Sequence, residues 1–343
     1  MTKFVFDALI VGGGPAGLSA ALALARVQRT ALVFDSGHYR NLGVSAMHTV
    51  LSRDGIPPTE FRQIARGQIE EKYPRIQFSS AQVSQASQTD IGDGYMGYRL
   101  TDTDETIYKG RKLILATGSE DLLPTNIDGY RENWPSHIYQ CLFCDGYEKQ
   151  GQPVGILEFS SPAYLGLALM SLQFSEDVTI YSNGPLSSDP SVQKALRTAS
   201  ASGVKIDERP IRRLINQGDT IGIKFDDTQT ITLGMLLHKP PTINRSQNLI
   251  DQLGLAKMEQ SAEVVVNPLF CESSLPGCFV AGDGGQLLKQ VAVAIGTGVR
   301  AASGVSFQLC NEEAPEPLSI SDHRPDQPVL TPRCIRHSPT RAR

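Results

Sequence analysis

The chain has 343 residues, of which 40% are hydrophobic and 20% are charged, and its formal net charge at pH 7 is −4. This composition is typical of a globular protein with room for two domains, each with its own core. The small negative charge argues against a nucleic-acid partner, and no apolar stretch is long enough to span a membrane. The amino-terminal residues contain no signal-peptide pattern, and six cysteines are too few for a disulfide scaffold, so we expect a cytoplasmic protein.

A dinucleotide-binding motif opens the chain. Residues 8–11 are an apolar run typical of a buried parallel strand, and residues 12–17, Gly-Gly-Gly-Pro-Ala-Gly, lead from it into a helix of small and apolar residues. In this motif Gly12 permits a tight turn, Gly14 lets a pyrophosphate approach the backbone, and Gly17 lets the helix pack closely on the strand. The free N–H groups of the helix N-terminus then face the phosphates. A second predicted strand ends at Asp35, where an acidic residue binds a ribose hydroxyl.

Two later segments favour FAD over NAD. Residues 112–118 predict a strand that ends in Ala-Thr-Gly, and residues 277–283 predict a strand that ends in Gly-Asp. Both resemble later FAD-contacting segments of flavoproteins with two dinucleotide domains, in which the Gly-Asp aspartate holds the ribityl chain. The helix expected after Asp283, from Gln290 onward, would direct its N-terminus at the pyrimidine edge of the flavin and stabilise the reduced ring.

A second domain is predicted between these two segments. Residues 154–157 form an apolar strand where a second dinucleotide motif would be expected, but no glycine follows it. Phe159 and Pro162 would crowd a pyrophosphate there, and the charge of Glu158 would repel one. The next strand, residues 178–181, ends with no Arg or Lys to meet a 2′-phosphate. The pattern predicts a βαβ domain that has lost the chemistry for NADPH.

A pair of cysteines, Cys141 and Cys144, precedes this second motif, and Asp145 follows the pair directly. Two thiols at this spacing can close a small disulfide ring, and such pairs carry one thiol that is ionised near neutral pH. The spacing also occurs in structural zinc sites, but the other cysteines form no second close pair. A redox-active pair is therefore favoured over a metal site. Asp145 could move the protons that thiol chemistry produces or consumes.

The order of these motifs resembles the low-molecular-weight thioredoxin reductases, from the first strand to about residue 309. More narrowly, residues 141–148 together with the segments 39–41, 47–48 and 53–55 are similar to the fungal dithiol oxidases of the gliotoxin oxidoreductase type. Those enzymes close disulfides in small secondary metabolites such as epidithiodioxopiperazines and use O₂ instead of a nicotinamide. The resemblance implies an FAD-dependent dithiol oxidase that releases H₂O₂ and forms a homodimer, with a small dithiol and O₂ as its reactants.

The fold implied is α/β, with two Rossmann-like dinucleotide-binding domains of which the second is degenerate. We expect residues 1–119 and 242–310 to form the FAD-binding domain and residues 120–241 to form the degenerate NADPH-type domain that carries the cysteine pair. Residues 311–343 are rich in proline, serine and charge, and we expect them to form a flexible tail.

The resemblance also implies roles for individual residues. Cys144 would be the thiol next to the flavin, and Cys141 the outer thiol that exchanges with substrate. The dithiol oxidases often carry a His after the second cysteine, whereas this chain carries Asp145, as thioredoxin reductases do. Asp145 and His48 therefore both stand as candidates for the acid–base group. The motifs and the resemblance together predict cofactor contacts from Gly12, Gly14, Pro15, Ala16, Gly17, Asp35, Ser36, Arg40, Asn41, His48, Val83, Thr117, Gly118, Asp283, Gln290 and Val291, and no metal site.

Two other functions are compatible with parts of this pattern. An NADPH-dependent thioredoxin reductase would need the nucleotide pocket that the second domain lacks. A flavin-bound redox sensor without turnover would use the same cysteine pair but would not consume O₂ steadily.

Overall fold

The first sheet has the strand before the glycine turn at its centre. The computed structural model describes residues 4–315. The strands of this sheet are β1 (Val5–Val11), β2 (Ala31–Phe34), β3 (Ile76–Ser79), β4 (Val83–Asp90), β5 (Met96–Asp102), β6 (Ile107–Leu115) and β17 (Cys278–Val280). Their order is β3-β2-β1-β6-β5-β4, and β17 pairs with β6. The strands around β1 are parallel, whereas β4 and β5 are antiparallel.

Helices cover both faces of this sheet because successive side chains of a strand point to opposite sides. Ala8 and Ile10 of β1 lie in one core with side chains of three helices, whereas Leu9 and Val11 lie in a second core with α7. The helices are α1 (Pro15–Arg26), α2 (Pro58–Lys72), α8 (Val291–Glu313) and, on the other face, α7 (Gln247–Gln252). A Cβ atom on Gly298 of α8 would lie 2.2 Å from the carbonyl oxygen of Ala16, so α1 and α8 pack with their backbones close together.

The second sheet is parallel and has the order β11-β10-β9-β15-β8. Its strands are β8 (Ile138–Tyr139), β9 (Val154–Leu157), β10 (Val178–Tyr181), β11 (Lys205–Asp207) and β15 (Met235–Leu237), with α5 (Tyr164–Ser171) and α6 (Pro190–Ala201) packed on it. An antiparallel sheet of β12 (Ile211–Asn216), β13 (Ile221–Phe225) and β14 (Thr230–Leu233) covers the other side. The short helices α3 (Tyr130–Asn133), α4 (Leu142–Asp145), η1 (Tyr147–Lys149) and η2 (Gly282–Gly285) complete the described elements.

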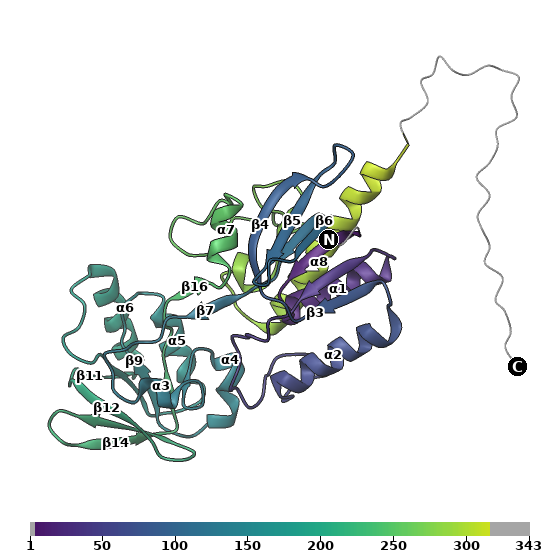
Figure 1. The fold of residues 1–343 in the computed structure, drawn as a ribbon. Helices are drawn as coiled ribbons and strands as arrows, with labels where there is room; N and C mark the ends of the chain where they lie inside the picture. Colours follow the sequence, from purple (N-terminus) through teal and green to yellow (C-terminus); the bar gives the residue numbers. More distant parts are fainter. Residues whose placement is uncertain (1–3, 316–343) are drawn as a thin grey trace, which may run out of the picture.

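A two-stranded antiparallel ribbon joins the two parts of the molecule. It consists of β7 (Ser119–Asp121), where the chain leaves the first part, and β16 (Thr242–Asn244), where it returns. Figure 1 shows this ribbon between the two sheets. The ribbon therefore sets how the second sheet sits against the first.

The predicted α/β fold with two Rossmann-like sheets is confirmed. The predicted start of the tail at residue 311 is wrong, because α8 continues to Glu313. Glu312 and Glu313 form ion pairs with Lys112 and Arg111, and Glu313 also pairs with Arg29 at 2.7 Å. These contacts hold the last helical turn on the first sheet. The remainder of the predicted tail, with Cys334, lies outside the described residues. Within residues 4–315, no helix combines the length and the apolar character of a membrane span.

Candidate active site

A cavity of about 1090 Å³ lies between the two sheets, lined by residues that follow the strands of both. The glycine turn and the cysteine pair contribute to the same cavity. All the predicted catalytic residues line it, as do all the predicted cofactor contacts except Gly17. The fold thus brings together residues that are far apart in the sequence.

The glycine turn forms one wall of the cavity. A Cβ atom on Gly12 would lie 2.2 Å from the carbonyl oxygen of Ala116, and one on Gly17 would lie 1.9 Å from that of Gly12. Gly17 is therefore required for packing and does not reach the cavity. Gly14 differs, since a Cβ atom there would have no described protein atom within 4 Å. No side chain in the described part of the chain caps the first turn of α1 at Gly14, so its N–H groups can meet an anionic group such as a pyrophosphate.

Asp35 lies at the end of β2 beside this turn. Its carboxylate accepts hydrogen bonds from the hydroxyl of Tyr39, at 2.7 Å from each carboxylate oxygen, and from the backbone N–H of Gly37. Burial and the bond to Asp35 raise the pKa of Tyr39 to about 12. The guanidinium of Arg62 stacks on the Tyr39 ring, 3.7 Å from its centroid. Sequence reasoning identified Asp35 but gave no role to Tyr39, whose position depends on the loop after β2.

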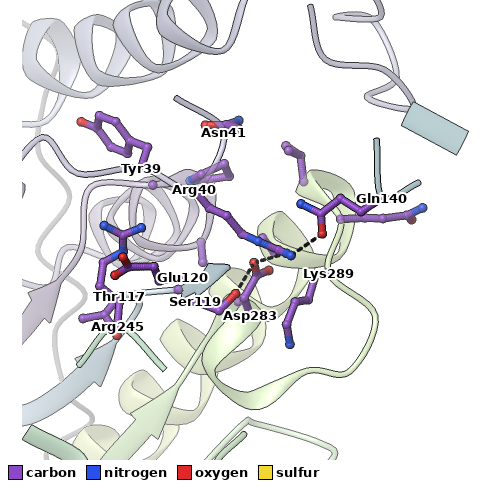
Figure 2. Close-up of a pocket in the computed structure, with 18 of the residues that line it drawn as sticks. Tyr39, Arg40, Asn41, Thr117, Ser119, Glu120, Gln140, Arg245, Asp283 and Lys289 are labelled. Atoms are coloured by element: carbon purple, nitrogen blue, oxygen red, sulfur yellow. Dashed lines mark hydrogen bonds and ion pairs between the residues drawn. The ribbon is translucent and has the colours of Figure 1, made fainter. Parts of the chain in front are cut away.

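Arg40 is the centre of a polar network that lines the cavity (Figure 2). It donates to both carboxylate oxygens of Asp121, to Asp283 and to the side-chain oxygen of Gln140. Ser119 also donates to Asp283, at 3.2 Å. The sequence predicted Arg40 and Asp283 as cofactor contacts but missed Asp121, Gln140 and Ser119, which belong to no motif.

Cys141 and Cys144 form a disulfide, with their Cα atoms 5.3 Å apart. Cys141 precedes α4 and Cys144 lies within it, and the carbonyl of Cys141 accepts from the backbone N–H groups of Cys144 and Asp145. Both cysteines are half-buried and line the cavity. The pairing of the two sulfurs with each other favours the redox interpretation over a shared zinc ligand set. Within the described residues, no cluster of three His, Cys, Asp or Glu side chains could hold a metal ion.

Asp145 and His48 both lie at this cavity. Burial raises the pKa of Asp145 to about 6, and the positive charge of His48 opposes this shift while Glu148 adds to it. The Nε2 atom of His48 is 3.6 Å from Glu148 and its Nδ1 atom is 3.4 Å from Asp54. Glu148 comes from the second sheet's side of the cavity and was not identified from the sequence. The two candidate acid–base groups therefore act on each other electrostatically, and Asp145 is poised to exchange protons in the pH range of thiol chemistry.

The turn after β9, where a second nucleotide would bind, is filled by the protein's own side chains. Phe159 is buried and packs on Tyr164, with the ring centroids 5.7 Å apart. Glu158 has a positive φ of 57° and its carboxylate lies 3.7 Å from the Nε2 atom of His238. His238 in turn bonds to the buried hydroxyl of Tyr130 at 2.7 Å. The turn thus carries packed and paired side chains where the glycine motif would need small residues.

Comparison with known protein families is consistent with the glycine turn and the disulfide at this site. The sequence profile of the family described as pyridine nucleotide-disulphide oxidoreductase matches residues 6–298. The chain belongs to this family. It is therefore an oxidoreductase, and members of the family generally bind FAD.

Individual proteins and solved structures that are similar to this chain support the same family assignment. The chain is 38% identical to a thioredoxin reductase named tcpT from Claviceps purpurea, over 90% of this chain and 95% of that protein. It is 37% identical to the thioredoxin reductase aclD from Aspergillus oryzae, over 91% of this chain and 99% of that protein. The crystal structure of an oxidoreductase from Agrobacterium tumefaciens matches with a TM-score of 0.80 and 29% identity, covering 90% of this chain and 100% of the other. The resemblance to fungal thioredoxin reductase-like enzymes is thus confirmed.

Two glycine substitutions should separate cofactor binding from folding. In Gly14→Ala the new methyl group meets no described protein atom and the backbone is extended, so the stability of the cofactor-free protein should change by less than about 0.5 kcal/mol. The methyl group should nevertheless weaken flavin binding, since it occupies space that a phosphate would use. In Gly17→Ala the clash with the Gly12 carbonyl should cost about 1–3 kcal/mol of folding stability. Thermal unfolding without flavin and flavin titration measure the two effects, and equal stability losses would contradict the assignment.

The buried carboxyl of Asp145 should make stability depend on pH. Its pKa is about 6 in the folded protein, whereas an aspartate in an unfolded chain titrates near about 3.9. The folded state therefore binds the proton more tightly, and stability is lost as the pH rises through 6. Asp145→Asn removes this loss, so it should be more stable than the parent by about 1–3 kcal/mol near pH 8 and equally stable near pH 4. Urea unfolding across this range measures the difference, and a difference that does not vary with pH would refute the buried-carboxylate explanation.

Proposed function

We propose that this protein is an FAD-dependent dithiol oxidase that closes a disulfide in a small secondary-metabolite dithiol, with O₂ as electron acceptor and H₂O₂ as product. The observation that carries the proposal is the pairing of an open glycine turn with the Cys141–Cys144 disulfide in one cavity, while the turn after β9 lacks glycine and carries the packed side chains of Phe159 and Tyr164. An enzyme of this fold that cannot take electrons from a nicotinamide has to obtain them from the substrate on its cysteine pair.

The chemistry of the donors suits FAD. The N–H groups at the start of α1 suit the pyrophosphate, Asp35 a ribose hydroxyl, and Asp283 the ribityl chain. Bound there, FAD would accept two electrons from the reduced cysteine pair and pass them to O₂. The overall reaction balances as one dithiol and one O₂ giving one cyclic disulfide and one H₂O₂.

The cysteine pair performs the exchange steps. A substrate thiolate attacks the sulfur of Cys141, the bond between Cys141 and Cys144 breaks, and Cys144 leaves as a thiolate. The second substrate thiolate then attacks the substrate sulfur of this mixed disulfide and releases Cys141. Asp145 and His48 line the same cavity as these sulfurs and can take up the two protons that the substrate loses. Trp134, Leu167 and Met170 give the cavity an apolar wall on the same side, which suits an organic substrate.

The second candidate is an NADPH-dependent thioredoxin reductase, which the names of the similar fungal proteins favour. It requires a nucleotide to bind at the turn that carries Glu158, Phe159 and Tyr164.

The main proposal also includes a cytoplasmic location and a homodimer. The small number of cysteines leads us to expect the first, and the resemblance leads us to expect the second.

The oxidase and the reductase are separated by their electron source. We expect H₂O₂ release and O₂ consumption when small dithiols are added to the FAD-loaded protein in air, with no change in rate when NADPH is included. NADPH alone should leave the flavin oxidised over the time of a stopped-flow trace. Rapid flavin bleaching by micromolar NADPH would decide for the reductase, and bleaching by a dithiol without sustained O₂ consumption would decide for a redox sensor.

The two cysteines should differ in their spectra. Cys144→Ser and Cys141→Ser should both lack turnover, because neither can form the disulfide that accepts substrate electrons. Cys141→Ser leaves a thiolate at Cys144 beside oxidised FAD, which should give a broad long-wavelength absorbance that fades when acid protonates the thiolate. Cys144→Ser should show no such band. The opposite pattern would reverse the inner and outer roles.

Asp145 and His48 can be compared in the same assay. If Asp145 is the general acid–base group, Asp145→Asn should slow turnover by roughly 10²–10⁴-fold while the absorbance band persists in the Cys141→Ser background. His48→Gln should then have a smaller effect. The reverse order of the two rate losses would assign the proton transfer to His48.

A further inference from the structure

We propose that Arg40 is a positioning residue that clamps the cysteine-bearing segment against the flavin-binding part of the cavity. The inference rests on the proposed function, because it assumes that the cysteine pair works next to FAD. It also gives Arg40 a different role from the direct cofactor contact that the sequence resemblance implied.

The strongest contact of Arg40 is with the ribbon that joins the two sheets. Its Nε and Nη2 atoms donate to the two carboxylate oxygens of Asp121 in β7, at 2.9 and 2.7 Å. The side chain of Asp121 is 6% exposed and that of Arg40 is 19% exposed, so water screens this pair only weakly. A two-point pair of this kind fixes orientation as well as distance.

The same guanidinium reaches the residue before the outer cysteine. Nη2 of Arg40 donates to the side-chain oxygen of Gln140 at 2.6 Å, and the Gln140 amide donates to Asp121 at 3.4 Å. These bonds link Arg40, Asp121 and Gln140 in a closed ring. Gln140 lies between β8, an edge strand of two residues, and Cys141. An edge strand of this length holds the segment with few backbone hydrogen bonds. The side-chain bonds among Arg40, Asp121 and Gln140 add to them directly before Cys141 and help to fix its position.

The third contact ties the network to the first sheet. Nη1 of Arg40 donates to Asp283 at 3.2 Å, just after β17, and Ser119 donates to the same carboxylate oxygen. One side chain therefore connects the end of the first sheet, the joining ribbon and the end of the second sheet. Figure 2 shows its bonds to Asp283 and Gln140. Burial disfavours the charge of Arg40, but the bonds to Asp121 and the nearby Asp283 outweigh it and raise the pKa of the guanidinium.

An arginine is required by this geometry. Its planar group presents several N–H donors in fixed directions, whereas a lysine ammonium is a point charge on a flexible stem. The observed bonds use Nε, Nη1 and Nη2 toward three different acceptor side chains. Arg40→Lys would keep the charge but could not keep all of these bonds, so it separates the clamp from simple charge neutralisation.

Two readouts test the clamp without measuring turnover. The first is the long-wavelength absorbance of Cys141→Ser, which reports the contact of Cys144 with FAD. The second is the rate of limited trypsin cleavage after Arg245, which directly follows the joining strand β16 and whose backbone N–H bonds to Gly118. Cleavage there requires the junction to open. Because Arg245 also lines the cavity, all variants are compared at the same saturating FAD concentration.

We expect Arg40→Gln to retain FAD at saturating concentration, to lose absorbance in the Cys141→Ser background, and to be cleaved at Arg245 at least about tenfold faster, the equivalent of one lost hydrogen bond to a charged group. Arg40→Lys should restore neither readout fully. Arg53→Gln is the matched control, because Arg53 lies in the same loop and donates to the backbone of Ser52 at an exposed site. It should behave as the parent.

Asp121→Asn provides a second route if Arg40→Gln does not fold, since it removes the carboxylate of the two-point pair and should also accelerate cleavage. Unchanged absorbance and cleavage in the Arg40 variants would overturn the clamp, as would loss of FAD affinity with unchanged cleavage, which would make Arg40 a cofactor contact. If Cys141→Ser itself lacks the absorbance, the proposed placement of Cys144 beside FAD fails, and the trypsin readout still decides on the clamp.

Discussion

The ribbon of β7 and β16 is the constraint on which the site depends. The glycine turn and the cysteine pair belong to different sheets, and each sheet folds around its own core. They form one cavity only because this ribbon holds the carboxyl ends of the two sheets toward each other. Two short strands provide few backbone hydrogen bonds for this task. Side chains therefore have to add to it, and the buried pair of Arg40 with Asp121 is placed on the ribbon itself.

The second domain keeps its fold although its nucleotide turn is closed. The side chains that fill the turn, Phe159 and Tyr164, are part of the core that holds β9 and α5 together. The pair of Glu158 and His238 joins this edge to the buried Tyr130, so the closed turn contributes to stability. The domain positions the cysteines at the active site, because the end of its edge strand β8 brings Gln140 and Cys141 to the cavity. In the proposed oxidase, this sheet serves as a support for the cysteines.

The sequence predicted those parts of the site that consist of short motifs of consecutive residues. The turn at Gly12 and Gly14, the Gly-Asp at Asp283 and the cysteine pair are short motifs with a physical reason for each position. Tyr39 lies only four residues from its partner Asp35, but the conformation of the loop between them is not specified by a motif. Asp121, Gln140 and Glu148 could not be predicted in this way, because their partners are distant in the chain and only the fold brings them together. The end of α8 was missed for the same reason. The composition after residue 310 suggested a tail, but Glu312 and Glu313 find cations on β6 that the local sequence does not reveal.

Proton transfer at the cavity follows from the same tertiary contacts. In the proposed reaction, oxidation of a dithiol releases two protons with two electrons, which requires groups that can accept protons near the reacting sulfurs. A carboxyl that is fully exposed would stay ionised and bind protons too weakly at neutral pH.

Burial raises the pKa of Asp145 to about 6, closer to neutral pH, and the positive charge of His48 opposes this shift. The charge of His48 thus acts on the proton affinity of Asp145, and both side chains line the cavity of the cysteine pair. Glu148, at 3.6 Å from His48, ties these groups to the helical segment that follows the cysteines. The helical segment that follows the cysteines therefore takes part in setting the proton affinity of the site.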